Sequence, residues 1–337
     1  MAEQIFIAGV GGYLPEKVVS NFDLAKIVDT SDEWITQRTG IHNRHIAKEE
    51  QFTSDLAVEA IKNAINNAMI TISDIDAIIC ATTTPDLTFP STACIIQKKL
   101  GIKKPIIAFD IQAVCSGFIY ALSVANDMMQ CRNLQNVVVV GSEKMSSIVD
   151  WSDRSTCVLF GDGAGAVVLQ KAKEESNSYI IDTEIFADGN FADILYTDGG
   201  VSNKNYDKRI VGVDGISKNS TAGSIQMNGQ GVFKHAVEKM TSSVKNIVEN
   251  NGFSIEDVKL IVPHQANYRI LSLVGEKLGI SFDKFMLTIG EHANTSSASI
   301  PLALDVAIKQ KKINKGDLIV LEALGSGLTW GSVLLRF

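Results

Sequence analysis

The chain has 337 residues, 45% of them hydrophobic, and its 31 basic and 38 acidic side chains give a formal net charge of −7. This composition excludes a disordered or collagen-like chain, and the acidic balance argues against broad nucleic-acid binding. No apolar run approaches the roughly 18 residues of a membrane span, and the first residues do not resemble a secretory signal. We therefore expect a soluble, cytoplasmic protein of about two domains without membrane insertion.

Short runs rich in Val and Ile predict buried strands, and apolar residues spaced at helical intervals predict helices between them. The main predicted elements in chain order are a helix at 54–69, a strand at 76–84, a helix opened by Cys115, a strand at 136–143, a helix at 229–252, a strand at 259–265, a helix opened by Asn294 and a strand at 317–327. This alternation indicates an α/β fold with a largely parallel core sheet.

A weak internal repeat indicates two similar halves. Residues 72–86 are similar in pattern to residues 254–267: in each, polar residues after a helix are followed by an apolar strand and a polar loop. Cys115 and Asn294 each open a helix that is followed, at similar spacing, by another apolar strand. We predict an N-terminal half at 1–172 and a C-terminal half at 173–337, with Cys115 and Asn294 at equivalent helix starts facing a shared centre.

Two glycine-rich stretches suggest nucleotide binding only weakly. In "GVGGYLP" the last glycine of the dinucleotide fingerprint is missing, and Pro15 interrupts the helix that should follow. "GDGAGAVVLQ" leads into β-branched residues and is interpreted as a turn between strands. The polar segment at 197–224 is interpreted either as an irregular excursion or flap, or as a disordered surface loop.

The five cysteines are scattered without a CxxC pair, so neither a disulfide framework nor a metal site is indicated. Cys80 and Cys157 are expected inside apolar strands. Cys115 lies at a strand-to-helix junction, where free N–H groups and the helix dipole can lower a thiol pKa. It is either a small buried side chain or a nucleophile. His264 follows a predicted strand and precedes "QAN", and it is the histidine best placed to act as a reacting group. Cys, His and Asn together also suit a protease, but a protease gives no reason for duplicated halves.

Six ordered motifs make a closer assignment possible. "SDEWITQRTGI", "CSGFIYALSVA", "LFGDGAGAVVL", "VPHQANYRI", "HANTSSASIPLAL" and "GSGLTWGSVLLRF" closely resemble the β-ketoacyl-acyl carrier protein synthase III family of thiolase-fold condensing enzymes. The resemblance runs from about residue 5 to Phe337 and weakens between 198 and 222. It implies a layered α/β/α/β/α core built from two pseudo-duplicated βαβ halves.

The resemblance implies that Cys115, His264 and Asn294 form the catalytic triad, with backbone N–H groups of Cys115 and Ser326 as the oxyanion hole. The implied reaction starts fatty-acid synthesis by condensing acetyl-CoA, or another short acyl-CoA, with malonyl-acyl carrier protein. The CoA thioester is a substrate, and no cofactor or metal is implied. HMG-CoA synthase is a weaker match, because Asp86 stands near the position where that enzyme carries a catalytic Glu.

Binding residues are also implied by the motifs. Those expected to bind CoA, line its pantetheine tunnel or line the acyl pocket are Trp34, Arg38, Thr39, Arg154, Gly229, Asn267 and Phe89. Those expected to bind carrier protein are Lys234, Gln265, Arg269 and Lys277, with Glu276 beside them. Phe89 matches an aromatic residue that reaches into the partner subunit's acyl pocket, which implies a homodimer.

Two rival functions stay open at this point. One is a relative on the same scaffold that makes a secondary metabolite or transfers the acyl group to another nucleophile. The other is a non-catalytic acyl-carrier or CoA-binding scaffold, which the intact Cys115, His264 and Asn294 set disfavours. Val114, where Ala is common, and the long 198–222 excursion could reshape the primer site.

Overall fold

Two β-sheets form the centre of the protein in the computed structural model, which describes residues 3–172, 176–202 and 223–337. The first sheet has the strand order β1-β7-β6-β4-β5 and the second has the order β11-β12-β13-β8. The strands of the first sheet are β1 (Ile5–Tyr13), β4 (Ala77–Ala81), β5 (Ile107–Ile111), β6 (Asn136–Glu143) and β7 (Gly163–Lys171). Those of the second are β8 (Tyr179–Ala187), β11 (Leu260–Pro263), β12 (Leu318–Gly325) and β13 (Thr329–Arg336).

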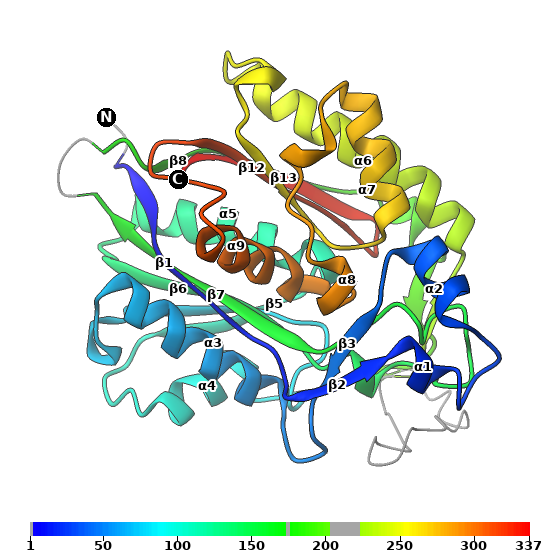
Figure 1. Ribbon diagram of the computed structural model, residues 1–337. Coiled ribbons are helices and arrows are strands. Elements are labelled where there is room, and N and C mark those ends of the chain that lie inside the picture. The colour runs from blue at the N-terminus through cyan, green and yellow to red at the C-terminus, as the bar shows by residue number, and fades with distance from the viewer. Residues whose placement is uncertain (1–2, 173–175, 203–222) are drawn as a thin grey trace.

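Helices separate and cover the two sheets, giving five layers (Figure 1). The outer helices of the first sheet are α3 (Thr53–Ala68) and α4 (Thr92–Leu100), and those of the second are α6 (Gly229–Asn250) and α7 (Tyr268–Leu278). Between the sheets lie α5 (Gly117–Cys131) and α9 (Ser299–Lys309). The predicted layered thiolase-like fold is confirmed.

The two sheets repeat one strand pattern, which explains the internal repeat of the sequence. In each sheet the first strand in sequence pairs antiparallel with the last, as β1 does with β7 and β8 does with β13. In each, two further strands run parallel, as β4 and β6 do and as β11 and β12 do. The expectation of a largely parallel sheet is therefore wrong, because the first and last strands of each half form an antiparallel pair.

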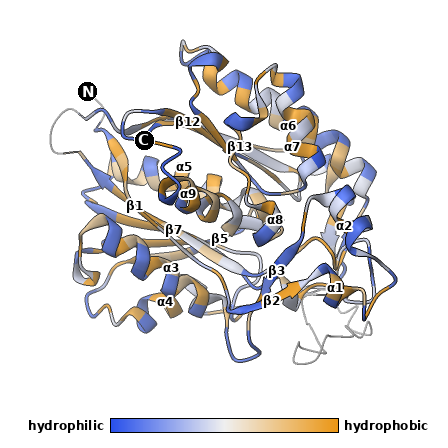
Figure 2. Ribbon diagram, viewed as in Figure 1, coloured by the Kyte–Doolittle hydropathy of each residue, from blue (hydrophilic) through white to orange (hydrophobic). Residues whose placement is uncertain are grey.

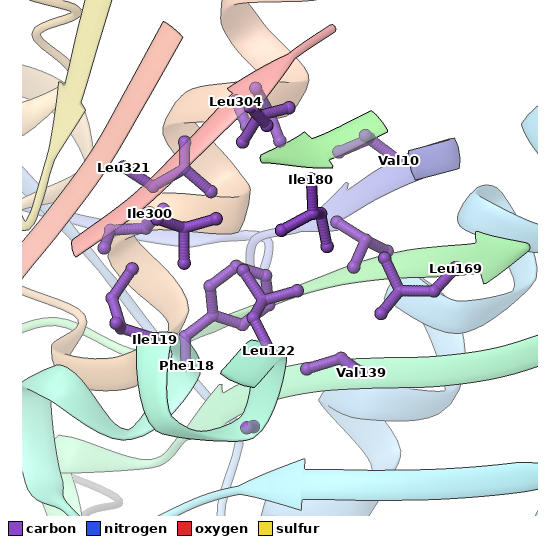
Figure 3. Close-up of a cluster of buried hydrophobic side chains, with 14 of the residues drawn as sticks. Val10, Phe118, Ile119, Leu122, Val139, Leu169, Ile180, Ile300, Leu304 and Leu321 are labelled. Carbon is purple, nitrogen blue, oxygen red and sulfur yellow. The ribbon is translucent and has the colours of Figure 1, made fainter. Parts of the chain in front are cut away.

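The largest apolar cluster lies between the sheets (Figure 3). It joins side chains of the central helices to the inward faces of both sheets, among them Phe118, Leu122, Val139, Ile300 and Leu321. Helices enclosed on both sides must be apolar all round, and Figure 2 accordingly shows much of α9 as hydrophobic, whereas α3 and α6 carry both kinds of residue. The central helices are thus held rigidly, and so are the segments at their starts.

A small subdomain lies beside the carboxyl ends of the strands. It contains β2 (Lys17–Ser20), α1 (Asn21–Leu24), α2 (Asp32–Thr39), β3 (Asn43–Ile46), β9 (Leu195–Thr197), β10 (Ile225–Met227) and α8 (Ile289–His292). Arg44 is fully buried there and donates to the Val19 and Val158 carbonyls, each at 3.1 Å, and to Asn21 Oδ1 at 2.8 Å. Burial lowers its pKa to about 10. Arg44 therefore joins β2 and α1 to the turn that contains Val158.

The main elements predicted from the sequence are present with shifts at their ends, the largest being the helix predicted from Asn294, which begins at Ser299. Cys157 is an exception, because it lies in a buried turn rather than a strand. Residues 163–170, interpreted as part of a turn, instead belong to β7. Of the expected excursion, residues 203–222 lie outside the described residues. The division at residues 172 and 173 stays a prediction. Within the described ranges, no helix is both long and apolar enough to cross a membrane.

Candidate active site

The candidate nucleophile lies in a strained turn between β5 and α5. Cys115 is the middle residue of a single 3-10 turn, η2 (Val114–Ser116), and is 5% exposed. Val114 before it has φ +47°, a left-handed conformation that a β-branched residue rarely adopts. Such strain persists only where the surrounding structure enforces it, and it is typical of functional sites.

Asn294 lies in a second strained turn, which precedes η7 (Ser296–Ala298) and α9. Its neighbours Ala293 and Ser296 have φ values of +57° and +51°. The Asn294 main chain is fixed on both sides, because its N–H donates to the Leu159 carbonyl at 2.9 Å and its carbonyl accepts from Gly161 N–H at 3.0 Å. The Ser296 N–H donates to Asn294 Oδ1 at 2.8 Å, which leaves the Asn294 amide nitrogen free to act as a donor.

His264 follows β11 and is almost fully buried. Its main-chain N–H donates to the Glu322 carbonyl at 2.7 Å, and its ring Nδ1 lies 2.7 Å from Ser299 Oγ, with the direction set by the tautomer. Burial lowers the pKa of His264 to about 3, so the ring is neutral at physiological pH. When Ser299 donates to Nδ1, the hydrogen of the neutral ring sits on Nε2, which can then donate.

The three residues converge on one short segment, residues 294–299. Asn294 begins it, the Ser296 hydroxyl hydrogen-bonds to the Cys115 thiol, and Ser299 binds His264. The η2 turn contacts η7 (Ser296–Ala298), and it also contacts the end of β12. The predicted triad is therefore gathered at one place, where two helix starts and a strand end meet.

The end of β12 lies close to the Cys115 main chain. A Cβ atom added to Gly325 would stand 2.9 Å from the Cys115 nitrogen, so only glycine permits this approach. Ser326 follows directly, and its hydroxyl donates to the Leu195 carbonyl. This places the loop that carries Ser326 beside Cys115, as an oxyanion hole formed by their two N–H groups would require.

The thiol of Cys115 is not acidified in this structure. Burial raises its pKa to about 12, and the hydrogen bond with Ser296 opposes that shift without overcoming it. The expectation that the helix start lowers the thiol pKa is therefore wrong for the protein without substrate, because desolvation of the thiolate is the larger effect.

A measurable consequence is the pH dependence of Cys115 alkylation. With a pKa of about 12, the alkylation rate by iodoacetamide should rise about tenfold per pH unit from pH 7 to 10, since the thiolate is the reacting species. Peptide mass spectrometry at timed intervals gives the rate for Cys115, with the exposed Cys131 as an internal reference. A plateau for Cys115 below pH 8 would contradict the expectation.

The residues expected to bind the CoA nucleotide largely lie together at the surface. Trp34, in α2, has the Arg38 and Arg154 guanidinium carbons 4.7 and 5.3 Å from its ring centre. Asn267 caps α7 and donates to the Arg38 carbonyl at 3.1 Å, which joins α2 to α7. Thr39 is not part of this surface, because it is buried and its hydroxyl is bonded to the Ile35 carbonyl and Ile41 N–H.

The predicted carrier-protein residues separate into two groups. Lys234, Arg269 and Lys277 are exposed on α6 and α7, which pack together, and Glu276 is exposed beside Lys277. Gln265 is fully buried, and its side-chain amide is hydrogen-bonded to main-chain groups at the end of β11 and in residues 286–289. Its prediction as a carrier-protein contact is therefore wrong.

Two other predicted residues lie on the surface. Gly229 is the exposed first residue of α6, and Phe89, between β4 and α4, is 83% exposed.

Sequence reasoning missed the polar residues that support the triad. Glu143, Ser296 and Ser299 are all buried and contact the site. The available signals were weak, namely a carboxylate ending the "NVVVVGSE" strand and a serine-rich run after Asn294.

A thiolase-like core with a cysteine, a histidine and an asparagine at its centre defines a condensing enzyme that transfers acyl groups. Comparisons with known proteins agree. Residues 109–189 match the family model described as 3-oxoacyl-[acyl-carrier-protein (ACP)] synthase III, and residues 248–337 match the model of its C-terminal part.

Full-length relatives are similar throughout. The chain is 53% identical to the β-ketoacyl-[acyl-carrier-protein] synthase III of Wolbachia pipientis wMel, covering 98% of this chain and 99% of the relative. It is 51% identical to that of Ehrlichia canis, covering 98% of both. The crystal structure of the Aquifex aeolicus synthase III superposes with a TM-score of 0.89 at 46% identity, covering 99% of this chain and 100% of that one. The chain belongs to the β-ketoacyl-acyl carrier protein synthase III family.

Proposed function

We propose that the protein condenses a short acyl-CoA, with acetyl-CoA as the first candidate, with malonyl-acyl carrier protein through an acyl-Cys115 intermediate. The observation that carries this proposal is the convergence of Cys115, His264 and Asn294 on residues 294–299. The products are 3-ketoacyl-carrier protein, CoA and carbon dioxide, which is the initiating condensation of fatty-acid synthesis.

In the first half-reaction the Cys115 sulfur attacks the acyl-CoA carbonyl carbon. The thiol proton leaves with the departing CoA sulfur, and an acyl thioester forms on Cys115. The oxyanion of the tetrahedral intermediate is held by the main-chain N–H groups of Cys115 and Ser326. Because the resting thiol pKa is raised to about 12, the thiol proton must leave as attack occurs. His264 can pass it to the CoA sulfur through Nε2 only in the other neutral tautomer, in which the ring hydrogen is on Nδ1 and donates to Ser299 Oγ.

In the second half-reaction malonyl-acyl carrier protein loses carbon dioxide, and the electron pair of the broken bond passes into an enolate. His264 Nε2–H and the Asn294 amide donate to the enolate oxygen, and each such donor is worth about 3 kcal/mol. The enolate carbon then attacks the acyl-Cys115 carbonyl, and the Cys115 sulfur leaves as a thiolate, which takes up a proton from solvent to restore the thiol. Two neutral donors suit this step, since neither must lose a proton.

The proposal is tested by incubating the protein with acetyl-CoA and malonyl-acyl carrier protein and weighing the intact carrier protein by mass spectrometry. Acetoacetyl-carrier protein is the expected product. A panel of longer and branched primers then defines the preferred acyl group. Acylation of Cys115 without any ketoacyl product would favour the rival function, acyl transfer to a different acceptor.

The cluster of Trp34, Arg38 and Arg154 is proposed to bind the CoA nucleotide. Its two guanidinium groups offer planar charge to phosphate, and the indole offers a stacking surface for adenine. Replacing Arg154 with Ala should raise KM for acetyl-CoA about three- to tenfold with little change in kcat, because this contact is remote from the reacting carbon. Steady-state kinetics measure both, and Arg132→Ala, at the far end of α5, is the matched control. A fall in kcat at unchanged KM would contradict the role.

A homodimer is proposed from the edge of the first sheet. β5 has a strand partner on one side only among the described strands, and nearby Leu87 and Phe89 are 54% and 83% exposed. Open strand edges and exposed aromatic residues are typical of interfaces. Phe89→Asp should raise the dimer dissociation constant at least about tenfold, as measured by sedimentation, whereas Phe22→Asp, on α1, should not. A wild-type monomer at micromolar concentration would contradict the proposal.

The α6–α7 surface with Lys234, Arg269 and Lys277 is proposed to receive the acidic carrier protein. Opposite charge accelerates encounter more than it strengthens the final complex. The cytoplasmic location stays a prediction from the sequence.

A further inference from the structure

Glu143 is a buried carboxylate that the mechanism above does not use. It is the last residue of β6 and is fully buried. One of its oxygens, Oε2, accepts hydrogen bonds from the loop after β4: Thr83 N–H at 3.0 Å, Thr84 Oγ at 2.8 Å and Thr82 Oγ at 3.2 Å. A buried carboxylate is costly unless its oxygens are satisfied, and these three hydrogen bonds satisfy Oε2.

The other carboxylate oxygen of Glu143 faces the candidate active site. Oε1 accepts from Ser296 Oγ at 3.1 Å and from Ser297 Oγ at 2.8 Å. Among the residues that the structure describes, no basic side chain forms an ion pair with Glu143. Its carboxylate therefore bridges the β4 loop to η7 by hydrogen bonds.

The main chains of β6 and η7 are also in close contact. A Cβ atom added to Gly141 would stand 2.3 Å from the Ser297 carbonyl oxygen, so glycine is required at this approach. The contact fixes the height of η7 above β6, and Glu143 fixes the direction of its hydroxyl groups.

Ser296 carries this restraint to Asn294. The left-handed φ of Ser296 is unfavourable by itself, and the hydrogen bond with Glu143 helps to maintain it. In this conformation the Ser296 N–H reaches Asn294 Oδ1 at 2.8 Å and fixes which end of the amide is the donor. We propose that Glu143 is a positioning residue, which orients the Asn294 amide through Ser296 for decarboxylation of malonyl-carrier protein. This inference rests on the proposed function.

Glu143→Gln is the substitution that tests the role with the least change in shape. The Thr83 main-chain N–H is a fixed donor, so the glutamine oxygen must face it, and the NH2 group then faces Ser296 and Ser297. Both serines lose the acceptor that orients them. The loss of negative charge should lower the pKa of the Cys115 thiol, because the charge of Glu143 raises it in the wild-type protein.

The expected result is therefore a divergence between two rates. Glu143→Gln should slow release of carbon dioxide from malonyl-carrier protein at least about tenfold, since small misplacement of an oriented donor is costly. Alkylation of Cys115 by iodoacetamide should be as fast as in the wild-type protein or faster. General destabilisation of the fold would not slow decarboxylation while leaving Cys115 alkylation unchanged. In the background of Asn294→Ala, Glu143→Gln should cause no further loss.

Ser297→Ala is the matched control, because it removes a hydrogen bond to the same Glu143 oxygen but leaves Ser296 in place. It should reduce decarboxylation by less than about threefold. Ser296→Ala keeps Glu143 and should reproduce the decarboxylation defect. It therefore tests the proposal even if Glu143→Gln does not fold. Equal slowing of both rates, wild-type decarboxylation in Ser296→Ala, or additivity with Asn294→Ala would overturn the proposal.

Crystal structures of the variants separate this inference from the proposed function. The Ser296 N–H to Asn294 Oδ1 bond should be lost in Glu143→Gln and kept in Ser297→Ala, whatever the activity. A wild-type protein that does not decarboxylate malonyl-carrier protein contradicts the proposed function, whereas an unchanged Asn294 amide in Glu143→Gln contradicts the positioning role.

Discussion

Replacing Cys115 with serine is expected to lower the rate of ketoacyl-carrier protein formation by at least roughly ten-thousandfold, the scale of loss found when a covalent nucleophile is removed. The substitution changes one atom and fits the same small site. A buried hydroxyl is far harder to deprotonate than a thiol whose pKa is already about 12, and an ester transfers its acyl group less readily than a thioester.

Intact-protein mass spectrometry provides the measurement, because it shows both the acyl group on the enzyme and the product on the carrier protein. Cys131→Ser, an exposed cysteine at the end of α5, should retain wild-type rates. Product formation by Cys115→Ser within a hundredfold of the wild-type rate would exclude the covalent mechanism. Decarboxylation of malonyl-carrier protein should continue in Cys115→Ser, because it requires His264 and Asn294 instead.

The second large effect is expected at the two enolate donors. His264→Ala and Asn294→Ala should each slow decarboxylation of malonyl-carrier protein by about a hundred- to a thousandfold, the usual loss for one oxyanion donor. Acylation should respond differently, since Asn294 has no proposed role in it. Asn294→Asp should be at least as damaging as Asn294→Ala, because a carboxylate repels the enolate.

Release of labelled carbon dioxide measures this half-reaction, and His42→Ala, an exposed histidine, is the control that should stay within about twofold of the wild type. The neutral state of His264 adds a pH criterion. Since burial lowers its pKa to about 3, protonation of His264 should cause no loss of decarboxylation between pH 5 and 8. A descending limb near pH 6 that disappears in His264→Ala would contradict the neutral-donor role.

Local and repeated patterns in the sequence predicted the order of strands and helices and the two similar halves, whereas the layered thiolase-like fold and the triad were implied by the resemblance to a known family. Apolar runs defined the strands, and the repeat placed Cys115 and Asn294 at equivalent helix starts. The side-chain environment could not be predicted in the same way. Gln265 was expected at the surface, but a buried amide and an exposed one look alike in sequence, and only the packing of the chain after β11 distinguishes them.

The same limit applies to charge and backbone conformation. The helix start at Cys115 suggested a lowered thiol pKa, yet desolvation depends on the whole fold and raises it. Glu143 could not be connected to Ser296, since 153 residues separate them in sequence. The left-handed conformations of Val114 and Ser296 were also unforeseen, because neither residue type favours them.

Those left-handed turns bear on how the protein can change during evolution. Glycine at Val114 or Ser296 would relieve the strain and stabilise the fold, yet it would also let both turns relax away from the arrangement that unites the triad. Drift toward a more stable chain is therefore opposed at these two positions by selection for turnover. Descendants that abandon the chemistry should be the first to acquire glycine there, so these residues distinguish a working condensing enzyme from a scaffold that retains only its shape.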